Sequence, residues 1–122
     1  MRLVADEGMA AWLDTFPAAA EDFEWDAGNR SKNLKHGVHA EEVEGLFREP
    51  IVFAGRIAEP LHDEPRSLLL GRDPDGRLLA LIFMRRGEKL RPISCRRMRR
   101  KERRVYEDAL QSEREKDPPA GR

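Results

Sequence analysis

The spacing of apolar residues changes near residue 50, from a helical period to the alternation that is typical of strands. Before that point the sequence predicts helices over residues 27–36 and 40–48, and Asp26 is suited to cap the first of them. A short strand is expected over residues 23–25, where apolar and acidic side chains alternate. Two helices are therefore predicted to come before the sheet.

After residue 50 the sequence predicts an antiparallel meander of about four strands, over residues 51–54, 66–72, 77–84 and 89–95. Residues 55–65 are expected to form a polar loop, and residues 73–76 predict a tight hairpin turn. Pro92 has no N–H to donate, so its strand must lie at a sheet edge or contain a bulge. A C-terminal helix over residues 98–111 completes an α+β fold, with the helices expected on one face of the sheet.

The chain is predicted to have three parts: an N-terminal extension over residues 1–22, a folded domain over residues 23–112, and a disordered tail over residues 113–122. Helical spacing in the extension predicts a short amphipathic helix, formed by Met9, Trp12, Leu13 and Phe16. This helix either lies on the domain or binds a partner. An alternative is that Met9 is the true start of the protein.

Charge is distributed unevenly along a chain whose formal net charge is zero. Residues 71–104 carry 13 Lys and Arg against 4 Asp and Glu, a net of +9. Residues 1–70 carry 7 against 14, and residues 105–122 carry 3 against 5, which gives −7 and −2. A basic region of this strength is typical of proteins that bind nucleic acid or an acidic protein partner.

Several classes of protein are excluded by what the sequence lacks. No run approaches the roughly 20 apolar residues of a membrane helix, and acidic Asp6 and Glu7 stand where a signal peptide would begin. We therefore expect a cytoplasmic protein with no membrane partner. The single cysteine, Cys95, excludes an internal disulfide. Neither metal-ligand spacing nor a phosphate-binding glycine loop nor a nucleophile elbow occurs, so no metal and no cofactor are expected.

The predicted C-terminal helix carries an acidic residue on its apolar side. That side is formed by Val105, Tyr106, Ala109 and Leu110. Glu102 lies within the same arc, where a carboxylate is costly unless it is paired, so we expect an arginine partner from the sheet, Arg66 or Arg96. The pair either only fixes how the helix packs or orients an arginine that contacts a substrate.

Arginines dominate the region around the start of this helix. Those expected to contact a polyanion such as nucleic acid are Arg97, Arg100, Arg103 and Arg104. The planar guanidinium group suits phosphate recognition, although a run of charge is also typical of a merely solvated face. His36, at the end of the first predicted helix, either complements the helix dipole or serves as a general base.

A set of stretches over residues 23–108 carries a family resemblance. In the helical half these are Phe23-Glu24-Trp25-Asp26, Asn33-Leu34-Lys35-His36-Gly37-Val38, Glu41-Glu42, Phe47 and Pro50. In the rest of the chain they are Glu64, Arg66, Gly71, Gly76-Arg77-Leu78-Leu79, Arg86-Gly87, Arg91, Ile93-Ser94, Arg96, Glu102-Arg103 and Tyr106-Glu107. Together they resemble the BrnT family of type II toxins, small ribonucleases with a RelE-like fold.

The resemblance implies a toxin domain over residues 23–112 that inhibits translation by cleaving RNA without a metal. It also implies a cognate antitoxin, expected to be of the ribbon-helix-helix type, that neutralises the toxin. The catalytic candidates carried over from the matching positions are His36, Arg66, Arg91, Arg96 and Tyr106. Cleavage by a 2′-hydroxyl needs a base, an acid and cations around the phosphorane, and these side-chain types supply all three.

Some positions depart from the family pattern. Pro92 replaces an apolar strand residue, Pro65 comes directly before Arg66, and Met84 replaces a small polar residue. His39-Ala40 stands where a Ser-Phe pair is common. These departures bear on activity more than on fold, and they leave open an alternative: a non-enzymatic basic module that binds an acidic protein or nucleic acid.

Overall fold

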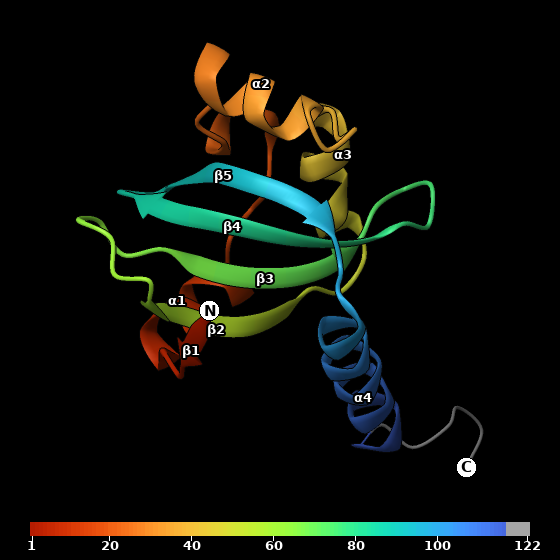
Figure 1. The fold of residues 1–122 in the computed structure, drawn as a ribbon. Coiled ribbons are helices and arrows are strands. Elements are labelled where there is room, and N and C mark those ends of the chain that lie inside the picture. Colours follow the sequence, from red (N-terminus) through yellow and green to blue (C-terminus); the bar gives the residue numbers. More distant parts are fainter. Residues whose placement is uncertain (117–122) are drawn as a thin grey trace.

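The computed structural model describes residues 1–116, and its elements follow one another as Figure 1 shows. The helices are α1 (Glu7–Asp14), α2 (Ala27–Leu34), α3 (Ala40–Gly45) and α4 (Arg100–Lys116), with short 3-10 turns η1 (Ala20–Asp22) and η2 (Leu46–Arg48). The strands are β1 (Arg2–Val4), β2 (Val52–Glu59), β3 (Ser67–Arg72), β4 (Leu78–Arg86) and β5 (Lys89–Arg97). The predicted α+β class, with two helices before an antiparallel sheet and a helix after it, is confirmed.

The sheet has five strands in the order β1-β2-β3-β4-β5, and every neighbouring pair is antiparallel. The extra strand, β1, comes from the predicted N-terminal extension and pairs with β2. β2 continues to Glu59, so residues 55–59 of the polar loop predicted over residues 55–65 are strand. A register shift between Phe53 and Gly55, where Gly55 has a φ of +136°, lets the strand pass close to the carbonyl of Val4.

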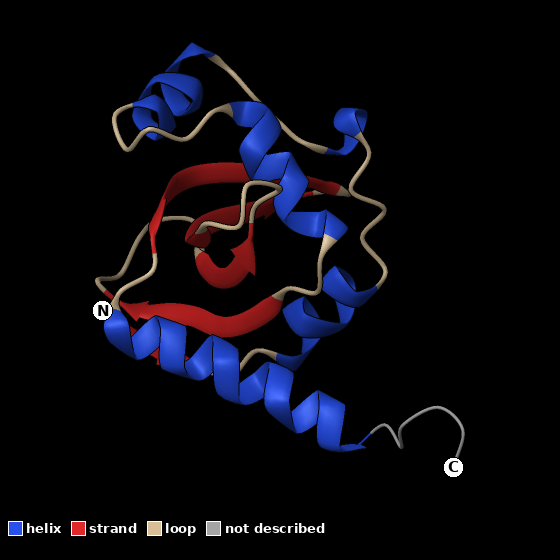
Figure 2. Ribbon diagram, turned by 90° about the vertical axis from the view of Figure 1, so that its right-hand side faces the viewer, coloured by secondary structure: helices blue, strands red, loops and turns tan. Residues whose placement is uncertain are grey.

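Helices cover both faces of the sheet, so the expectation that they lie on one face was wrong. On one face, Leu69 and Leu81 pack with residues of α1 and α3. On the other, Leu68 and Leu70 pack with Tyr106 of α4. Neighbouring residues of a strand point to opposite faces, and each face of β3 is apolar, so each has a helix layer. Figure 2 shows α4 along one side of the sheet, across from α2 and α3.

The N-terminal segment packs on the domain, as one of the sequence alternatives proposed. Leu13 of α1 is buried in the core that α3 shares. Phe16 contacts the rings of Phe23 and Phe47 at centroid distances of 5.4 and 5.5 Å. The guanidinium of Arg85 lies 4.8 Å from the ring centroid of Trp12. These contacts join the first residues of the chain to the same apolar core.

The strand that contains Pro92 satisfies both conditions set by that proline. β5 is an edge strand, and its register with β4 shifts between Ile82 and Phe83, where Phe83 pairs with Pro92. α2 covers this edge with two buried asparagines. Asn29 Nδ2 donates to the Pro92 carbonyl at 2.9 Å, and Asn33 Oδ1 accepts from the Cys95 N–H at 2.7 Å.

The last helix is longer than predicted and ends at Lys116 rather than at residue 111. The predicted disordered tail therefore begins inside α4, and its residues 117–122 lie outside the described residues. Among residues 1–116, no helix is long and apolar enough to cross a membrane.

Candidate nucleic-acid interface

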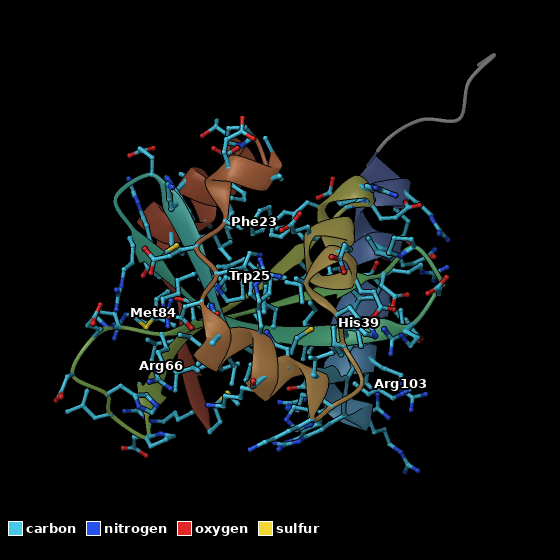
Figure 3. The ribbon with its side chains drawn as sticks, turned by 90° about the horizontal axis from the view of Figure 1, so that it is seen from above. Phe23, Trp25, His39, Arg66, Met84 and Arg103 are labelled. Carbon is cyan, nitrogen blue, oxygen red and sulfur yellow. The ribbon has the colours of Figure 1, made fainter. Side chains whose placement is uncertain are left out.

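The α4 face of the sheet is covered at one end only. Ala80 of β4 is in register with Leu70 of β3 and with Arg96 of β5. Leu70 and Ala80 lie beneath α4. At the other end, Met84 is in register with Arg91. Figure 3 shows Arg66 and Met84 at this end of the molecule, and His39 and Arg103 at the opposite end. This end lies beyond α4 (Figure 1), and we call it the uncovered end, although Met84 itself is only 5% exposed there.

A cleft of about 230 Å³ lies at the uncovered end of this face. Its apolar lining is Met1, Ile57, Pro60, Ile82 and Ile93. Four polar side chains complete it: Lys32 from α2, His62 from the β2–β3 loop, Arg66 and Ser94. Two cations, an imidazole and a hydroxyl thus share one cavity, and we call this cavity the Arg66 cleft.

Backbone hydrogen bonds fix the position of Arg66. Its carbonyl accepts from the N–H of Ile57 at 2.8 Å, so the residue is held against β2 just before β3 begins. Pro65, one of the departures from the family pattern, restricts the backbone directly before it. The side chain is partly buried, and no carboxylate lies within 4.0 Å of its guanidinium among the residues described. Its charge is therefore available to an anionic ligand.

Arg91, which does not line the cleft, is bound by two carboxylates. Its guanidinium donates to Glu24 at 3.2 Å and to Asp26 at 2.8 Å. The N–H of Asn29 and the Arg91 side chain lower the pKa of Asp26, so the carboxylate stays charged. Arg91 therefore holds the start of α2 against β5, and its charge is compensated before any ligand binds.

Arg86 extends the same network to the loop that carries His62. It donates to Glu24 at 3.4 Å and to Glu64 at 3.0 Å. Glu64 belongs to the β2–β3 loop, two residues after His62. The ion pairs thus connect the loop to the β4–β5 hairpin and help to place the imidazole at the cleft.

Glu102 is paired with Arg96, one of the two partners that the sequence offered. The two nitrogens of the guanidinium donate to the two carboxylate oxygens at 2.7 and 2.9 Å, and the side chains are 17% and 15% exposed. Glu102 also accepts from the N–H of Arg99 at 2.7 Å, at the start of α4. Burial alone would raise the pKa of Glu102, but these hydrogen bonds outweigh it and lower that pKa.

Two other catalytic candidates lie away from the Arg66 cleft. Tyr106 is 1% exposed and packs with Leu68, Leu70 and Met98, so as placed it is a core residue and is out of reach of RNA. His36 is exposed on the turn after α2. That turn is tied to the opposite end of the sheet, because Arg77 donates to the Gly37 carbonyl at 3.1 Å. The structure therefore does not bring His36, Arg66 and Tyr106 together.

The four arginines expected to bind RNA are all exposed: Arg97, Arg100, Arg103 and Arg104. Arg97 ends β5, and the other three lie in the first two turns of α4. None has a carboxylate within 4.0 Å of its guanidinium among residues 1–116. Cations near a helix N-terminus oppose the helix dipole, so this position is not explained by helix stability. It suits an anionic partner better.

His62 is the residue of the cleft that the sequence argument did not select. Its only local signal is its place four residues before Arg66, in a loop with two prolines. His36 drew attention instead, because it stands in a family motif. The cleft lining places His62, rather than His36, in one cavity with Arg66.

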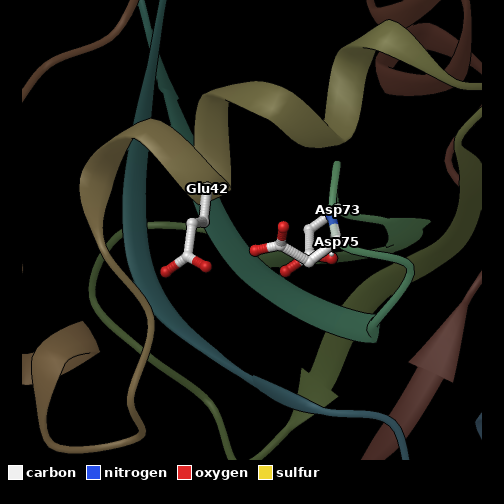
Figure 4. A group of neighbouring side chains, drawn as sticks. All are labelled: Glu42, Asp73 and Asp75. Atoms are coloured by element: carbon white, nitrogen blue, oxygen red, sulfur yellow. Dashed lines mark hydrogen bonds between the residues drawn. The ribbon is translucent and has the colours of Figure 1, made fainter.

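The acidic cluster at the β3–β4 hairpin is already occupied by an arginine. Glu42, Asp73 and Asp75 offer carboxylate oxygens within 4.8 Å of one another, and Figure 4 shows them where α3 meets the hairpin. Arg77 donates to Asp73 at 2.7 Å and to Glu42 at 2.6 Å. The bond to Asp73 raises the pKa of Arg77. The cluster is thus explained as an ion-pair network that joins α3 to the hairpin.

The cysteine is not a candidate nucleophile. Cys95 is fully buried in the core beneath α1 and α3, and burial raises the pKa of its thiol to about 12. A thiol must lose its proton to attack a substrate, so this one is inert near neutral pH.

A family model matches this chain, and the matched residues include every residue of the Arg66 cleft except Met1. The family is described as "Ribonuclease toxin, BrnT, of type II toxin-antitoxin system", and the match covers residues 25–102. That range is more than half of the chain and holds α2, α3 and β2 to β5. No curated protein matches the sequence. The chain therefore belongs to the BrnT family of ribonuclease toxins of type II toxin–antitoxin systems.

Proposed function

We propose that this protein is an endoribonuclease that cleaves RNA at the Arg66 cleft without a metal ion and so inhibits translation. The observation that carries the proposal is the joint placement of His62 and Arg66 in one cavity on the uncovered sheet face. The cavity combines a proton acceptor with unpaired positive charge. The function of the family supports RNA as the substrate.

The proposed reaction uses the 2′-hydroxyl of RNA as the nucleophile. His62 takes the proton from this hydroxyl, the bond between the 2′-oxygen and phosphorus forms, and the bond from phosphorus to the 5′-oxygen breaks. The leaving 5′-oxygen takes a proton from solvent, so the products are a 2′,3′-cyclic phosphate and a 5′-hydroxyl. Arg66 and Lys32 stabilise the charge on the phosphorane oxygens, as cations do in other phosphoryl transfers.

The other sequence candidates are assigned supporting roles. Arg91 positions α2, which carries Lys32, through its bonds to Glu24 and Asp26. Arg96 fixes α4 through Glu102. We assign His36 and Tyr106 no part in the chemistry, because they lie outside the cleft.

Replacing Arg66 tests the proposed site. We expect Arg66→Ala to lower the rate of RNA cleavage by about 10²- to 10³-fold, because one donor to the transition-state charge is lost. Arg48→Ala, which removes an exposed arginine from η2, is the matched control and should leave the rate unchanged. The measurement is cleavage of an RNA oligonucleotide in excess EDTA, with growth arrest on expression as the cellular counterpart.

Two results would contradict this proposal. Cleavage that disappears in EDTA and returns with a divalent ion would overturn its metal independence. If expression of the chain is harmless and Arg66→Ala changes nothing, the ribonuclease assignment fails. In that case the alternative, a non-enzymatic basic module, is the better account.

The exposed arginines of α4 and the end of β5 are proposed to bind the RNA backbone. In an Arg66→Ala background, we expect the combined variant Arg97→Gln, Arg100→Gln, Arg103→Gln and Arg104→Gln to bind RNA more weakly. The slope of log K against log salt should become shallower by about 2 to 3, since each phosphate contact contributes about 0.7 for a single strand. Fluorescence anisotropy with a labelled oligonucleotide measures both.

A smaller loss of positive charge elsewhere, two cations instead of four, helps to separate local contact from net charge. Lys35→Gln together with Arg48→Gln removes two exposed cations, one at the end of α2 and one in η2. This double change should alter the slope of log K against log salt by less than about 0.5. An unchanged slope in the four-arginine variant would show that RNA does not contact this surface.

We also propose that a cognate antitoxin, expected to be of the ribbon-helix-helix type, neutralises the toxin in the cytoplasm. The family assignment supports a partner of this class. The test is growth arrest when the chain is expressed alone and rescue when the neighbouring gene product is expressed with it. Arrest that is not rescued would overturn the assignment of that partner.

A further inference from the structure

A second hollow lies on the same sheet face, between α4 and the first three strands. It has a volume of about 290 Å³. Its floor is aliphatic and consists of Leu3, Ala54, Leu68, Leu70 and Val105. Val105 is 49% exposed, although it belongs to the apolar side of α4. We call this hollow the α4 groove.

The edge of the α4 groove is cationic. Arg99 and Lys101 line it, both are exposed, and neither has a carboxylate within 4.0 Å among the residues that the structure describes. The one acidic residue of the lining, Glu102, is bound to Arg96. The groove therefore offers aliphatic surface in the middle and uncompensated positive charge at its edge.

This combination fits a protein segment better than RNA. The floor has no aromatic ring on which a base would stack, and aliphatic side chains offer no hydrogen bonds to base edges. Aliphatic side chains of a partner fill such a floor, and carboxylates beside them pair with Arg99 and Lys101. An exposed apolar side chain such as Val105, rimmed by charge, is also typical of protein interfaces.

We propose that the α4 groove is where the antitoxin binds, through a segment of aliphatic side chains flanked by carboxylates. The inference rests on the proposed neutralisation by an antitoxin. Met1 lines both the α4 groove and the Arg66 cleft, so the two hollows adjoin on one face. A segment that occupies the groove and continues past Met1 covers the cleft and blocks RNA.

Two substitutions in the groove test the proposal with the product of the neighbouring antitoxin gene as the probe. We expect Val105→Glu to weaken binding of the antitoxin at least tenfold, because a carboxylate replaces an apolar contact. Lys101→Glu should weaken binding about tenfold and make the affinity less sensitive to salt. Both variants should still cleave RNA when purified alone, because neither residue lines the Arg66 cleft.

The chain offers a close control for each change. Leu34 on α2 has the same exposed fraction as Val105, 49%, so Leu34→Glu makes the same chemical change away from the groove. Arg48→Glu is the control for Lys101→Glu. Neither control should alter antitoxin affinity, which isothermal titration calorimetry measures for all five proteins.

The outcomes separate the groove from the proposed function. If the wild-type chain does not bind the antitoxin, neutralisation fails and the groove proposal fails with it. If the wild type binds and the groove variants bind equally well, only the groove proposal is overturned. Loss of RNA cleavage by Val105→Glu in a folded protein would assign the groove to RNA, and conversion of a dimer to a monomer would assign it to a second copy.

Discussion

Replacing His62 with alanine is expected to lower the rate of RNA cleavage by about 10²- to 10⁴-fold, the range that a general base contributes. The reason is its place in the Arg66 cleft with Arg66, Lys32 and Ser94. Binding of RNA should change little, because the imidazole carries less of the phosphate contact than the cations do. The expected result is therefore a fall in kcat with a nearly constant KM.

The other histidines make this prediction discriminating. His39→Ala removes an exposed imidazole from the start of α3 and should leave the rate unchanged. His36→Ala decides between the family motif and the geometry. The motif predicts a large fall in the rate of RNA cleavage, whereas the structure predicts no fall, because His36 does not line the cleft. Full activity in His62→Ala together with a large loss in His36→Ala would refute the assignment made from the structure.

Chemical rescue distinguishes a proton acceptor from a residue that only shapes the loop. Added imidazole should restore part of the activity of His62→Ala, because it can occupy the vacated space and accept the proton. It should not restore Arg66→Ala, where the lost group is a cation. Equal unfolding midpoints for the wild type and His62→Ala would show that the loss is not one of folding.

The parts of the fold that could be predicted depend on local signals. The turn at residues 73–76 and the two possible solutions for Pro92 follow from backbone chemistry alone. The need of Glu102 for an arginine follows from its place on one helical wheel. In each case the information lies within a few residues of sequence.

The features of the fold that the sequence prediction missed depend on contacts between residues far apart in the sequence, or on a pattern that was overlooked. β2 continues from Arg56 to Glu59 because β1 pairs with these residues, and β1 lies about 50 residues earlier in the sequence. The apolar run Leu68-Leu69-Leu70 did contain a signal that helices cover both faces, since an uninterrupted run is typical of a strand buried on both sides.

The candidate site was harder to predict than the fold. His62 reaches the cleft only because the loop after β2 folds back toward Arg66 and Glu64 binds Arg86. No periodicity shows such a loop position. Tyr106 is the opposite case. Its place in the apolar arc of the wheel indicated burial, and the family motif alone made it a catalytic candidate.

The largest effect on stability is expected from breaking the Arg96–Glu102 pair on one side only. Glu102→Leu leaves the guanidinium of Arg96, 17% exposed, without its partner and removes the acceptor for the Arg99 N–H. We expect the free energy of unfolding to fall by about 2 to 3 kcal/mol, somewhat less than for a fully buried pair. Urea denaturation measures the change.

A double substitution shows whether the loss comes from the arginine left behind. Arg96→Met with Glu102→Leu should be only about 1 kcal/mol less stable than the wild type, since the remaining cost is the unsatisfied N–H at the start of α4. Glu107→Leu, an exposed change on the same helix, should stay within about 0.5 kcal/mol. A double variant as unstable as Glu102→Leu would show that the pair itself contributes the stability.

The effect of Glu102 should also depend on pH in a direction that its pKa sets. Arg96 and the Arg99 N–H hold the pKa of Glu102 in the folded protein below its ordinary value of 4.5, despite burial. A carboxyl group with a lowered pKa stabilises the fold fully above its unfolded pKa, and this contribution is lost as pH falls through the folded pKa. The difference in free energy of unfolding between the wild type and Glu102→Leu, which we call the stability gap, should thus be constant from about pH 5.5 upward. It should become smaller below about pH 4.5. A gap that widens in acid would mean that Glu102 is protonated more easily in the folded protein, which the bidentate pair with Arg96 does not allow.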